Sequence, residues 1–241
     1  MTNKNILYGK NAIHNAININ PEIIEIIFIL KKSKTTDKIT YLIKLKKISM
    51  IYVKKHINNI PSEIQIVCKL KNNTNKKTTL LSIIKKTKTP LFLILDRIQD
   101  PHNLGACIRS AEAANVTAII LTKNRSAKLS PLVLKISCSN LNKIQIITIN
   151  NLVKTINILK ANNILIIGMS ANNNNSIYKK DLKIPIAIII GSETNGIKQL
   201  VLKSCDDICK IPTYGTNKSL NVSVATGITL FEAQRQRNIN L

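Results

Sequence analysis

The chain has 241 residues and a formal net charge of +24, with 36 lysines and arginines against 12 acidic residues. This length allows one large domain or two smaller ones, and the charge favours a polyanionic partner such as RNA, although an AT-rich gene would also enrich lysine. Aromatic residues make up 3% of the chain and tryptophan is absent, which argues against extensive base-stacking platforms.

No segment of the sequence predicts export or membrane insertion. The N-terminus lacks the apolar stretch of a signal peptide, and no apolar run approaches the roughly 18 residues of a membrane span. The five cysteines form no CxxC pair, and Cys205 and Cys209, four residues apart, have no histidine nearby. We therefore expect a cytoplasmic protein with reduced thiols, no metal and no membrane contact.

The first 70 residues predict a small α/β unit. Apolar stretches within residues 22–30, at 48–53 and at 64–70 are typical of strands. Between the first two, a polar, lysine-rich stretch that ends near Lys47 predicts a helix.

A basic connection follows this unit. Residues 69–88 carry seven lysines and no acidic residue, and they include the apolar group LLSII, which predicts a short helix. We expect residues 71–89 to be an exposed linker between two domains, 1–70 and 90–241.

The second part of the chain alternates strand-length apolar runs with helical patterns. Because these runs are apolar throughout, they predict strands buried on both faces, as in a parallel sheet with helices on each side. The fold class is therefore expected to be α/β. The expected strands are 91–96, 116–121, 143–148, 163–168 and 186–191, and the expected helices are 103–114, 129–138, 151–161, 197–204 and 219–236.

A sheet of this kind is typical of proteins that bind a nucleotide or nucleoside at the carboxyl ends of the strands. None of the seven glycines forms a GxGxxG or GxxxxGK[ST] pattern, so neither a Rossmann fingerprint nor a P-loop holds the ligand. His102 lies close to Asp100, but the chain has no GxSxG nucleophile elbow, which excludes that type of hydrolase.

The stretch DPHNLGACIRSAEAA, residues 100–114, places an arginine on a helix in a chain that otherwise relies on lysine. Asp96 is expected to end a strand, Asn103 to cap the helix, and Gly105 to permit close backbone approach. Arg109 follows six residues after Asn103. Taken alone, this pattern fits an ordinary capped helix with a surface arginine equally well.

A second stretch, IAIIIGSETNGI at residues 186–197, runs from a buried strand into a turn with two glycines. Such a turn exposes backbone N–H groups and admits a ligand. Glu193 is one of six glutamates in the chain and stands at the carboxyl end of the strand. The alternative for this residue is a helix-capping carboxylate.

The third stretch is ICKIPTYGTNKSLNVSVATGITLFEAQRQR, residues 208–237. Ile211 and Pro212 are expected to close a strand. Ser219 and Asn221 are expected to open the last helix, because both residue types are poor inside helices and good at their ends. The terminal QRQR is expected to solvate that helix.

Together, NLGACIRSAEA, GSETNG and IPTYGTNKSLNVSVATGI resemble the three motifs of the SpoU-type (SPOUT-class, TrmH-like) RNA ribose 2′-O-methyltransferases, in the same order. The resemblance covers about residues 90–237, and the N-terminal unit with YGKNAIHNAI resembles the L30e-like substrate-binding domain of that family. Within the family, the chain looks most like the bacterial enzymes that methylate a guanosine in the peptidyl-transferase P loop of 23S rRNA. The resemblance implies a trefoil-knot domain, a homodimer, RNA as substrate and S-adenosylmethionine as methyl donor.

The family motifs also imply the site residues. Gly191, Ile211 and Leu220 would line the cofactor pocket, and the reaction site would contain Asn103, Arg109, Glu193, Ser219 and Asn221. The family places Arg109 nearest the ribose hydroxyl. Because a guanidinium stays protonated, we expect Arg109 to clamp a phosphate and stabilise the alkoxide, with the role of base as the alternative.

The sequence departs from the family motifs at three places. Thr194 stands where a third glycine is usual, Thr213 replaces a methionine, and IPSEIQ at 60–65 replaces a histidine-glutamine-glycine stretch. A threonine at 194 would be strained if that position required a positive φ. Two alternatives therefore stay open, a tRNA ribose methyltransferase and an RNA-binding protein with a degenerate active site.

Overall fold

The computed structural model describes residues 6–19, 21, 24–29, 34–53, 66–70, 79–137, 144–216 and 219–238. The chain divides into two compact units, which we describe separately. One unit comprises Met1–Lys77 and Leu129–Asn142, and the other comprises Thr78–Lys128 and Lys143–Leu241. The divergent stretch 60–65 and residues 71–78 of the expected linker lie outside the described residues, whereas residues 79–89 contain a short helix, Leu80–Ile84, and belong to the second unit.

The first unit is built on a four-stranded sheet. Its elements are β1 (Ile6–Tyr8), α1 (Lys10–Ile19), β2 (Ile24–Ile29), α2 (Lys34–Leu45), β3 (Met50–Tyr52), β4 (Ile66–Leu70) and α5 (Pro131–Ser137). The strand order is β1-β4-β2-β3, with β2 and β3 parallel and the other neighbours antiparallel. Isoleucines such as Ile13 and Ile17 of α1, Ile43 of α2 and Ile27 of β2 form its core.

Within the described residues, the three strands predicted for this unit correspond to β2, β3 and β4. The sequence analysis missed β1 and α1, which are short and lack a long apolar run. Helix α5 was expected at 129–138 among the elements of the second part of the chain. The structure groups it with the first unit, where it packs against β1.

The second unit contains a six-stranded sheet in the order β10-β8-β9-β5-β6-β7. Its strands are β5 (Leu91–Leu95), β6 (Ala118–Thr122), β7 (Gln145–Ile149), β8 (Leu165–Met169), β9 (Ile186–Ile190) and β10 (Asp207–Cys209). Its helices are α3 (Leu80–Ile84), α4 (Pro101–Ala113), α6 (Leu152–Lys160), the 3-10 helix η3 (Ile177–Lys179), α7 (Gln199–Ser204) and α8 (Val222–Arg237). Every neighbouring strand pair of this sheet is parallel. The prediction of an α/β fold with a mostly parallel sheet is confirmed.

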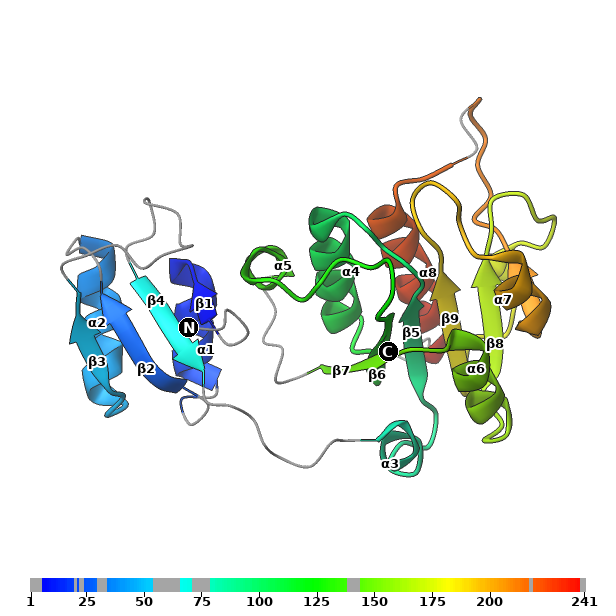
Figure 1. Ribbon diagram of the computed structural model, residues 1–241. Helices are drawn as coiled ribbons and strands as arrows, with labels where there is room; N and C mark the ends of the chain where they lie inside the picture. The colour runs from blue at the N-terminus through cyan, green and yellow to red at the C-terminus, as the bar shows by residue number, and fades with distance from the viewer. Residues whose placement is uncertain are drawn as a thin grey trace. The chain divides into compact units, whose positions relative to one another are not determined.

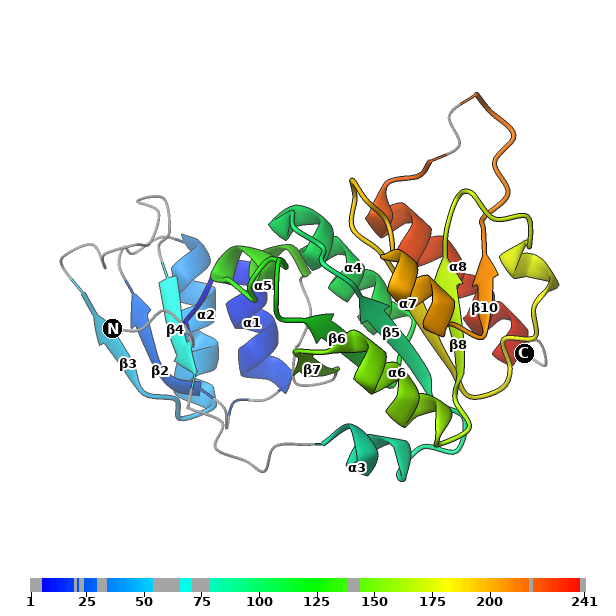
Figure 2. The same cartoon turned by 45° about the vertical axis from the view of Figure 1, so that its right-hand side comes forward.

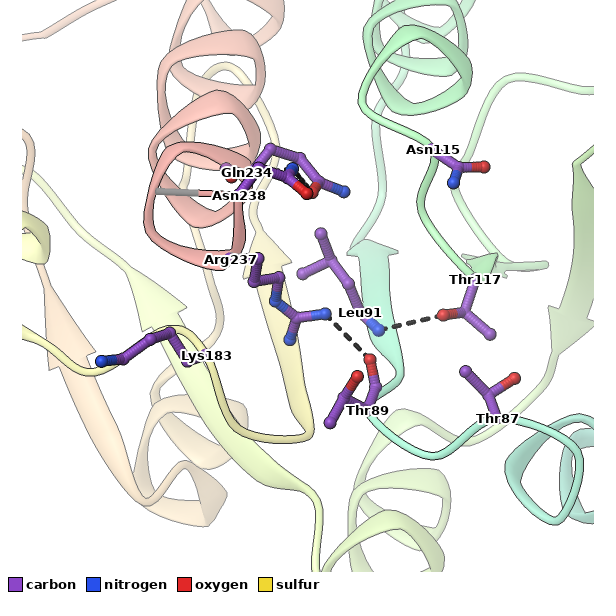
Figure 3. A pocket seen from close by; sticks show the side chains of 9 residues that line it. All are labelled: Thr87, Thr89, Leu91, Asn115, Thr117, Lys183, Gln234, Arg237 and Asn238. Carbon is purple, nitrogen blue, oxygen red and sulfur yellow. Dashed lines mark hydrogen bonds between the residues drawn. The ribbon is translucent and has the colours of Figure 1, made fainter. Parts of the chain in front are cut away.

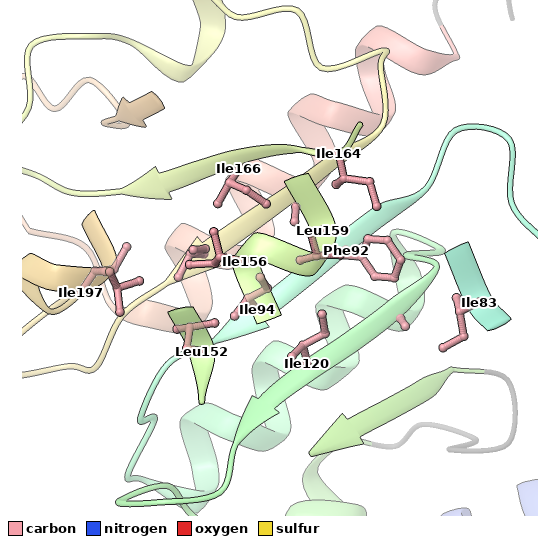
Figure 4. Packing of buried hydrophobic residues seen from close by; sticks show 14 residues of the cluster. Ile83, Phe92, Ile94, Ile120, Leu152, Ile156, Leu159, Ile164, Ile166 and Ile197 are labelled. Atoms are coloured by element: carbon pink, nitrogen blue, oxygen red, sulfur yellow. The ribbon is translucent and has the colours of Figure 1, made fainter. Parts of the chain in front are cut away.

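Helices cover both faces of this sheet (Figures 1 and 2). On one face, α3, α6 and α7 pack on alternate strand residues, and Figure 4 shows Phe92 and Ile94 of β5 against Ile156 and Leu159 of α6. On the other face lie α4 and α8, which pack on each other. The fully apolar strands follow from this double coverage, because neither side of the sheet meets water.

The chain order creates a crevice at the middle of the sheet. Strands β5 and β9 are neighbours, but the chain leaves β5 through α4 towards β6 and leaves β9 through α7 towards β10 at the opposite edge. The loop after β5 and the loop after β9 therefore run in opposite directions at the carboxyl ends of the strands. Parallel α/β sheets bind their ligands at such a switch point.

Three predicted boundaries were wrong. Helix α4 begins at Pro101 and its N-cap is Asp100, whose carboxylate accepts from the His102 N–H at 2.9 Å, so Asn103 lies inside the first turn. Proline suits the first helical position because its missing N–H would have no partner there. Helix α8 begins at Val222 with Asn221 as its N-cap, which leaves Ser219 before the helix. The last strand ends at Cys209, ahead of the expected close at 211–212.

Candidate active site

A pocket in the described part of the second unit lies at the carboxyl ends of β8, β9 and β10. Its volume is about 700 Å³, within the range of small-molecule sites. Four parts of the chain meet there, namely the start of α4, the loops after β8 and β9, and the segment that joins β10 to α8 (orange in Figure 2). Seven of the eight predicted site residues line it: Asn103, Gly191, Glu193, Ile211, Ser219, Leu220 and Asn221.

The loop after β9 forms one wall of this pocket, and Gly191 determines its shape. A Cβ at Gly191 would lie 2.1 Å from the carbonyl carbon of Gly196 and 2.3 Å from the nitrogen of Ile197, so no larger residue fits. Gly196 has a φ of +58°, and it exchanges two backbone hydrogen bonds with Ser192, at 2.9 and 3.1 Å. The loop is therefore a closed turn that leaves backbone, rather than side chains, against the pocket.

The two threonine departures are accommodated in this wall. The positive φ of the turn falls on Gly196, and Thr194 is not among the described residues with a positive φ. The strain expected for a threonine at 194 is therefore absent. Thr213 is half-buried and lines the same pocket.

Three polar side chains form a chain of hydrogen bonds across the crevice. The Asn221 amide donates to the Asn103 oxygen at 3.1 Å, and the Asn103 amide donates to Glu193 Oε1 at 3.1 Å. The Glu193 carboxylate also accepts from the backbone N–H groups of Gln99 and Asp100, each at 3.4 Å. Residues distant in sequence are thus held in one orientation by groups that do not need to change their protonation.

Arg109 is the predicted residue that the structure does not place in this pocket. It lies six residues, and thus about 9 Å along the helix axis, after Asn103 on α4. Its side chain is exposed and makes no hydrogen bond or ion pair with any described residue. All of its donors are therefore available to a ligand.

The structure adds residues that the sequence analysis had not assigned to the site. Met169, the last residue of β8, and the next three residues, Ser170, Ala171 and Asn172, line the pocket, although the sequence marks this segment only as the start of an asparagine-rich loop. Lys210 also lines it, directly after β10. The signal for the loop after β8 was available, because every parallel strand presents its carboxyl end at the same edge.

The described cysteines are free thiols that take no part in this site. Burial raises the pKa of Cys107 to about 11, despite a contact with the Thr226 hydroxyl that lowers it. Burial likewise raises the pKa of Cys68 to about 12. Within the described residues, no three His, Cys, Asp or Glu side chains gather to hold a metal ion, and none of the helices found there is long and apolar enough to cross a bilayer.

The second pocket, of about 420 Å³, lies near the amino ends of β5 and β6, and Figure 3 shows its lining. There the Arg237 guanidinium donates to the carbonyls of Thr89 at 2.9 Å, Leu182 at 2.8 Å and Ile184 at 2.6 Å. The expectation that the terminal QRQR solvates the last helix was therefore wrong for Arg237. Its role is to tie the end of α8 to the segments that lead into β5 and β9.

Comparisons with known proteins identify the second unit. The SpoU rRNA Methylase family model matches residues 90–231. A 23S rRNA (guanosine-2′-O-)-methyltransferase RlmB from Photorhabdus laumondii is 39% identical over 174 residues, which cover 72% of this chain and 71% of the relative. A protein of the same name from Blochmanniella floridana is 36% identical over 241 residues and covers 96% of this chain and 95% of its own.

The fold agrees with a solved structure as well. The SpoU methyltransferase AviRb from Streptomyces viridochromogenes, in complex with the cofactor AdoMet, matches with a TM-score of 0.78 at 21% identity, over 96% of this chain and 90% of that chain. The family match spans the sheet and all three motifs that form the pocket. The chain belongs to the SpoU rRNA methylase family.

Proposed function

We propose that this protein transfers a methyl group from S-adenosylmethionine to the ribose 2′-hydroxyl of a guanosine in 23S rRNA, in the peptidyl-transferase P loop. The observation that carries the proposal is the pocket at the carboxyl ends of β8, β9 and β10, which is lined by seven of the residues that the family motifs indicate. Two relatives that bear the name 23S rRNA (guanosine-2′-O-)-methyltransferase RlmB are 39% and 36% identical to the chain. A ribosomal RNA substrate fits a cytoplasmic location.

The pocket fits a nucleoside cofactor. Gly191 presents backbone where a Cβ would collide with the turn, Ile211 and Leu220 offer apolar contact, and the volume is about 700 Å³. S-adenosylmethionine, when bound, supplies a methyl group on a sulfonium that a nucleophilic oxygen can attack. We assign Gly191, Ile211 and Leu220 to its binding.

The polar residues of the hydrogen-bonded network position the reacting hydroxyl. Asn221 donates to Asn103 and Asn103 donates to Glu193, each at 3.1 Å, so these side chains are held in fixed orientations where they line the pocket. Because these amides do not titrate, they keep their orientation at all pH values near neutrality. We assign Ser219 to a phosphate or hydroxyl contact.

Arg109 is the group we assign to the RNA. A planar guanidinium binds a phosphate with two parallel hydrogen bonds and stabilises an adjacent alkoxide, which a lysine does less well. Arg109 has no partner among the described residues, so binding would break no existing bond. Its permanent positive charge favours this role over that of a general base.

The remaining parts of the chain fit RNA recognition. The net charge of +24 provides long-range attraction to phosphates. We propose that residues 1–70 form an L30e-like substrate-binding domain, with 71–89 as a basic linker and 90–241 as the methyltransferase domain. The mixed four-stranded sheet with α1 and α2 supports the first assignment.

We also propose that the second unit contains a trefoil knot. After β10 the chain runs beside the loop that follows β8, since the Lys210 N–H donates to the Asn175 carbonyl at 2.7 Å and the Ile177 N–H donates to the Lys210 carbonyl at 2.9 Å. It then returns past the turn after β9 before it enters α8. This route around two other loops is the course that a knotted segment takes.

A homodimer is the assembly that the exposed apolar residues favour. Val224 and Phe231 lie on α8, seven residues apart, and they are 49% and 52% exposed. Apolar side chains at this spacing share one helix face and favour a protein partner. We expect light scattering to give twice the chain mass for the native protein and the single chain mass for Phe231→Glu. A native monomer would contradict the assignment.

The function is tested by incubating the protein with S-adenosylmethionine and 23S rRNA that lacks its modifications, with unmodified tRNA as the control. We expect one methyl group on one guanosine of 23S rRNA and none on tRNA. Methylation of tRNA alone would instead support the tRNA enzyme. An absence of cofactor binding at millimolar concentration, measured by calorimetry, would support an RNA-binding protein without activity.

A further inference from the structure

Arg97 occupies an unusual position directly after the end of β5. Its φ is +60°, in the left-handed region that glycine adopts easily and arginine does not. Its side chain is only 12% exposed, and it is ion-paired with the neighbouring carboxylate of Asp96, which is 5% exposed. A strained backbone and a buried ion pair persist where the surrounding contacts hold them.

The Arg97 side chain binds the turn after β9 that lines the pocket, although Arg97 itself does not line it. Its Nε donates to both oxygens of Asp96, at 3.3 and 3.2 Å. Its Nη2 donates to Asp96 Oδ2 and to the carbonyl of Gly196, each at 3.2 Å. The Gly196 carbonyl oxygen is also the atom that a Cβ on Gly191 would approach to 2.5 Å. Arg97 therefore holds the peptide that closes the turn over Gly191.

The same short segment fixes both ends of the turn. The Asp96 N–H donates to the carbonyl of Ile190 at 2.9 Å, directly before Gly191, and Arg97 holds Gly196 at the other end. The Arg97 N–H is itself anchored by the Thr122 hydroxyl at 2.9 Å. We infer that Arg97 is a positioning residue that holds the Gly191–Gly196 turn in its cofactor-binding shape without touching the ligand.

This role predicts a specific pattern of effects, and it rests on the proposed function for the identity of the ligand. Loss of the Arg97 contact frees the Gly196 end of the turn that lines the cofactor. Glu193 belongs to the same turn, but its carboxylate stays bound to the Asn103 amide and to the N–H groups of Gln99 and Asp100. The change should therefore weaken cofactor binding and leave the RNA affinity and the rate at saturating cofactor nearly unchanged.

The test compares Arg97→Gly with the native protein. Glycine relieves the positive φ and removes only the side chain. We expect the dissociation constant of S-adenosylmethionine, measured by calorimetry without RNA, to rise about tenfold, as the loss of one charge-assisted hydrogen bond implies. We expect kcat at saturating cofactor and KM for rRNA to stay within about twofold, which a general loss of structure would not produce.

Two further variants keep the result interpretable. Arg125→Gly is the matched control, because Arg125 also has a positive φ, of +56°, but is exposed and has no partner among the described residues. It should leave cofactor affinity unchanged. If Arg97→Gly fails to fold because Asp96 is left buried and unpaired, the double variant Asp96→Asn/Arg97→Gly removes that charge and is measured instead.

Hydrogen exchange separates this inference from the proposed function. In the protein without ligand, the amides of Ser192 and Gly196, which bond each other's carbonyls, should exchange faster in Arg97→Gly than in Arg125→Gly. Equal exchange rates and an unchanged dissociation constant in a folded variant would overturn the role of Arg97. If native protein bound no S-adenosylmethionine but the exchange rates differed as expected, the proposed function would fail while the positioning role would stand.

Discussion

Two arginines of the second unit, Arg237 and Arg109, are used in opposite ways. At the amino end of the six-stranded sheet, Arg237 donates to the carbonyls of Thr89, Leu182 and Ile184, and burial lowers its pKa from the ordinary value (Figure 3). On α4, Arg109 is exposed and donates to no described residue. An arginine whose donors are satisfied by backbone carbonyls stabilises the fold, whereas one with free donors is available to a phosphate.

The residues that line the two pockets differ in the same way as these two arginines. The pocket at the carboxyl ends is lined by residues of several loops and by a network of polar side chains that bond one another without ligand. The pocket at the amino ends is crossed by side-chain bonds that join three segments of the chain. Substitutions in the pocket at the carboxyl ends should therefore lower cofactor binding or activity. Substitutions in the pocket at the amino ends should lower the free energy of unfolding.

The strongest test of this division is Gly191→Ala. The added Cβ would lie 2.1 Å from backbone carbon, so the turn after β9 must open or shift. We expect cofactor binding to fall by more than about 100-fold, because several contacts of the pocket wall move together. Calorimetry with S-adenosylmethionine provides the measurement. Gly215→Ala is the control, since a Cβ there meets no atom within 4 Å, and equal affinities for the two variants would contradict the prediction.

Arg109→Lys tests the free arginine. Lysine keeps the charge but cannot form the two parallel bonds to a phosphate, so we expect the rate of rRNA methylation to fall about 100-fold. Cofactor affinity and melting temperature should not change, because Arg109 does not line the pocket and makes no hydrogen bond or ion pair with any described residue. Arg125→Lys, at another exposed arginine, should keep the native rate. Near-native turnover of Arg109→Lys at saturating cofactor would overturn the assignment.

The sequence predicted the parts of this molecule that depend on local pattern. Continuous apolar runs predicted the parallel strands. Residues of the three motifs, such as Asn103, Glu193 and Asn221, line one pocket, and their roles there stay predictions. The predicted start of α4 was wrong because both Asp100 and Asn103 are good N-caps. Pro101, which lies between them, favours Asp100 as the N-cap, because proline suits the first helical position.

The contacts of Arg97 and Arg237 could not be inferred from the sequence. Arg97 and its acceptor Gly196 are 99 positions apart in the sequence, and Arg237 and its acceptor Thr89 are 148 positions apart. Neither residue has a local pattern that distinguishes it from a solvated arginine, because its role comes from strands that become neighbours only in the folded sheet. Such roles depend on hydrogen bonds between segments that are distant in the sequence.

Arg237→Lys is expected to have the smallest effect and to be confined to stability. Lysine has three donors on one nitrogen and cannot span carbonyls that belong to separate segments, so at least one of them loses its partner. The cost of such a loss is about 2 kcal/mol, which should appear as a lower midpoint in urea unfolding. Arg125→Lys is the control, because Arg125 is exposed and makes no hydrogen bond or ion pair with any described residue. If Arg237→Lys reduced the methylation rate in a fully folded sample while the midpoint stayed native, the amino end of the sheet would have to be counted as part of the functional site.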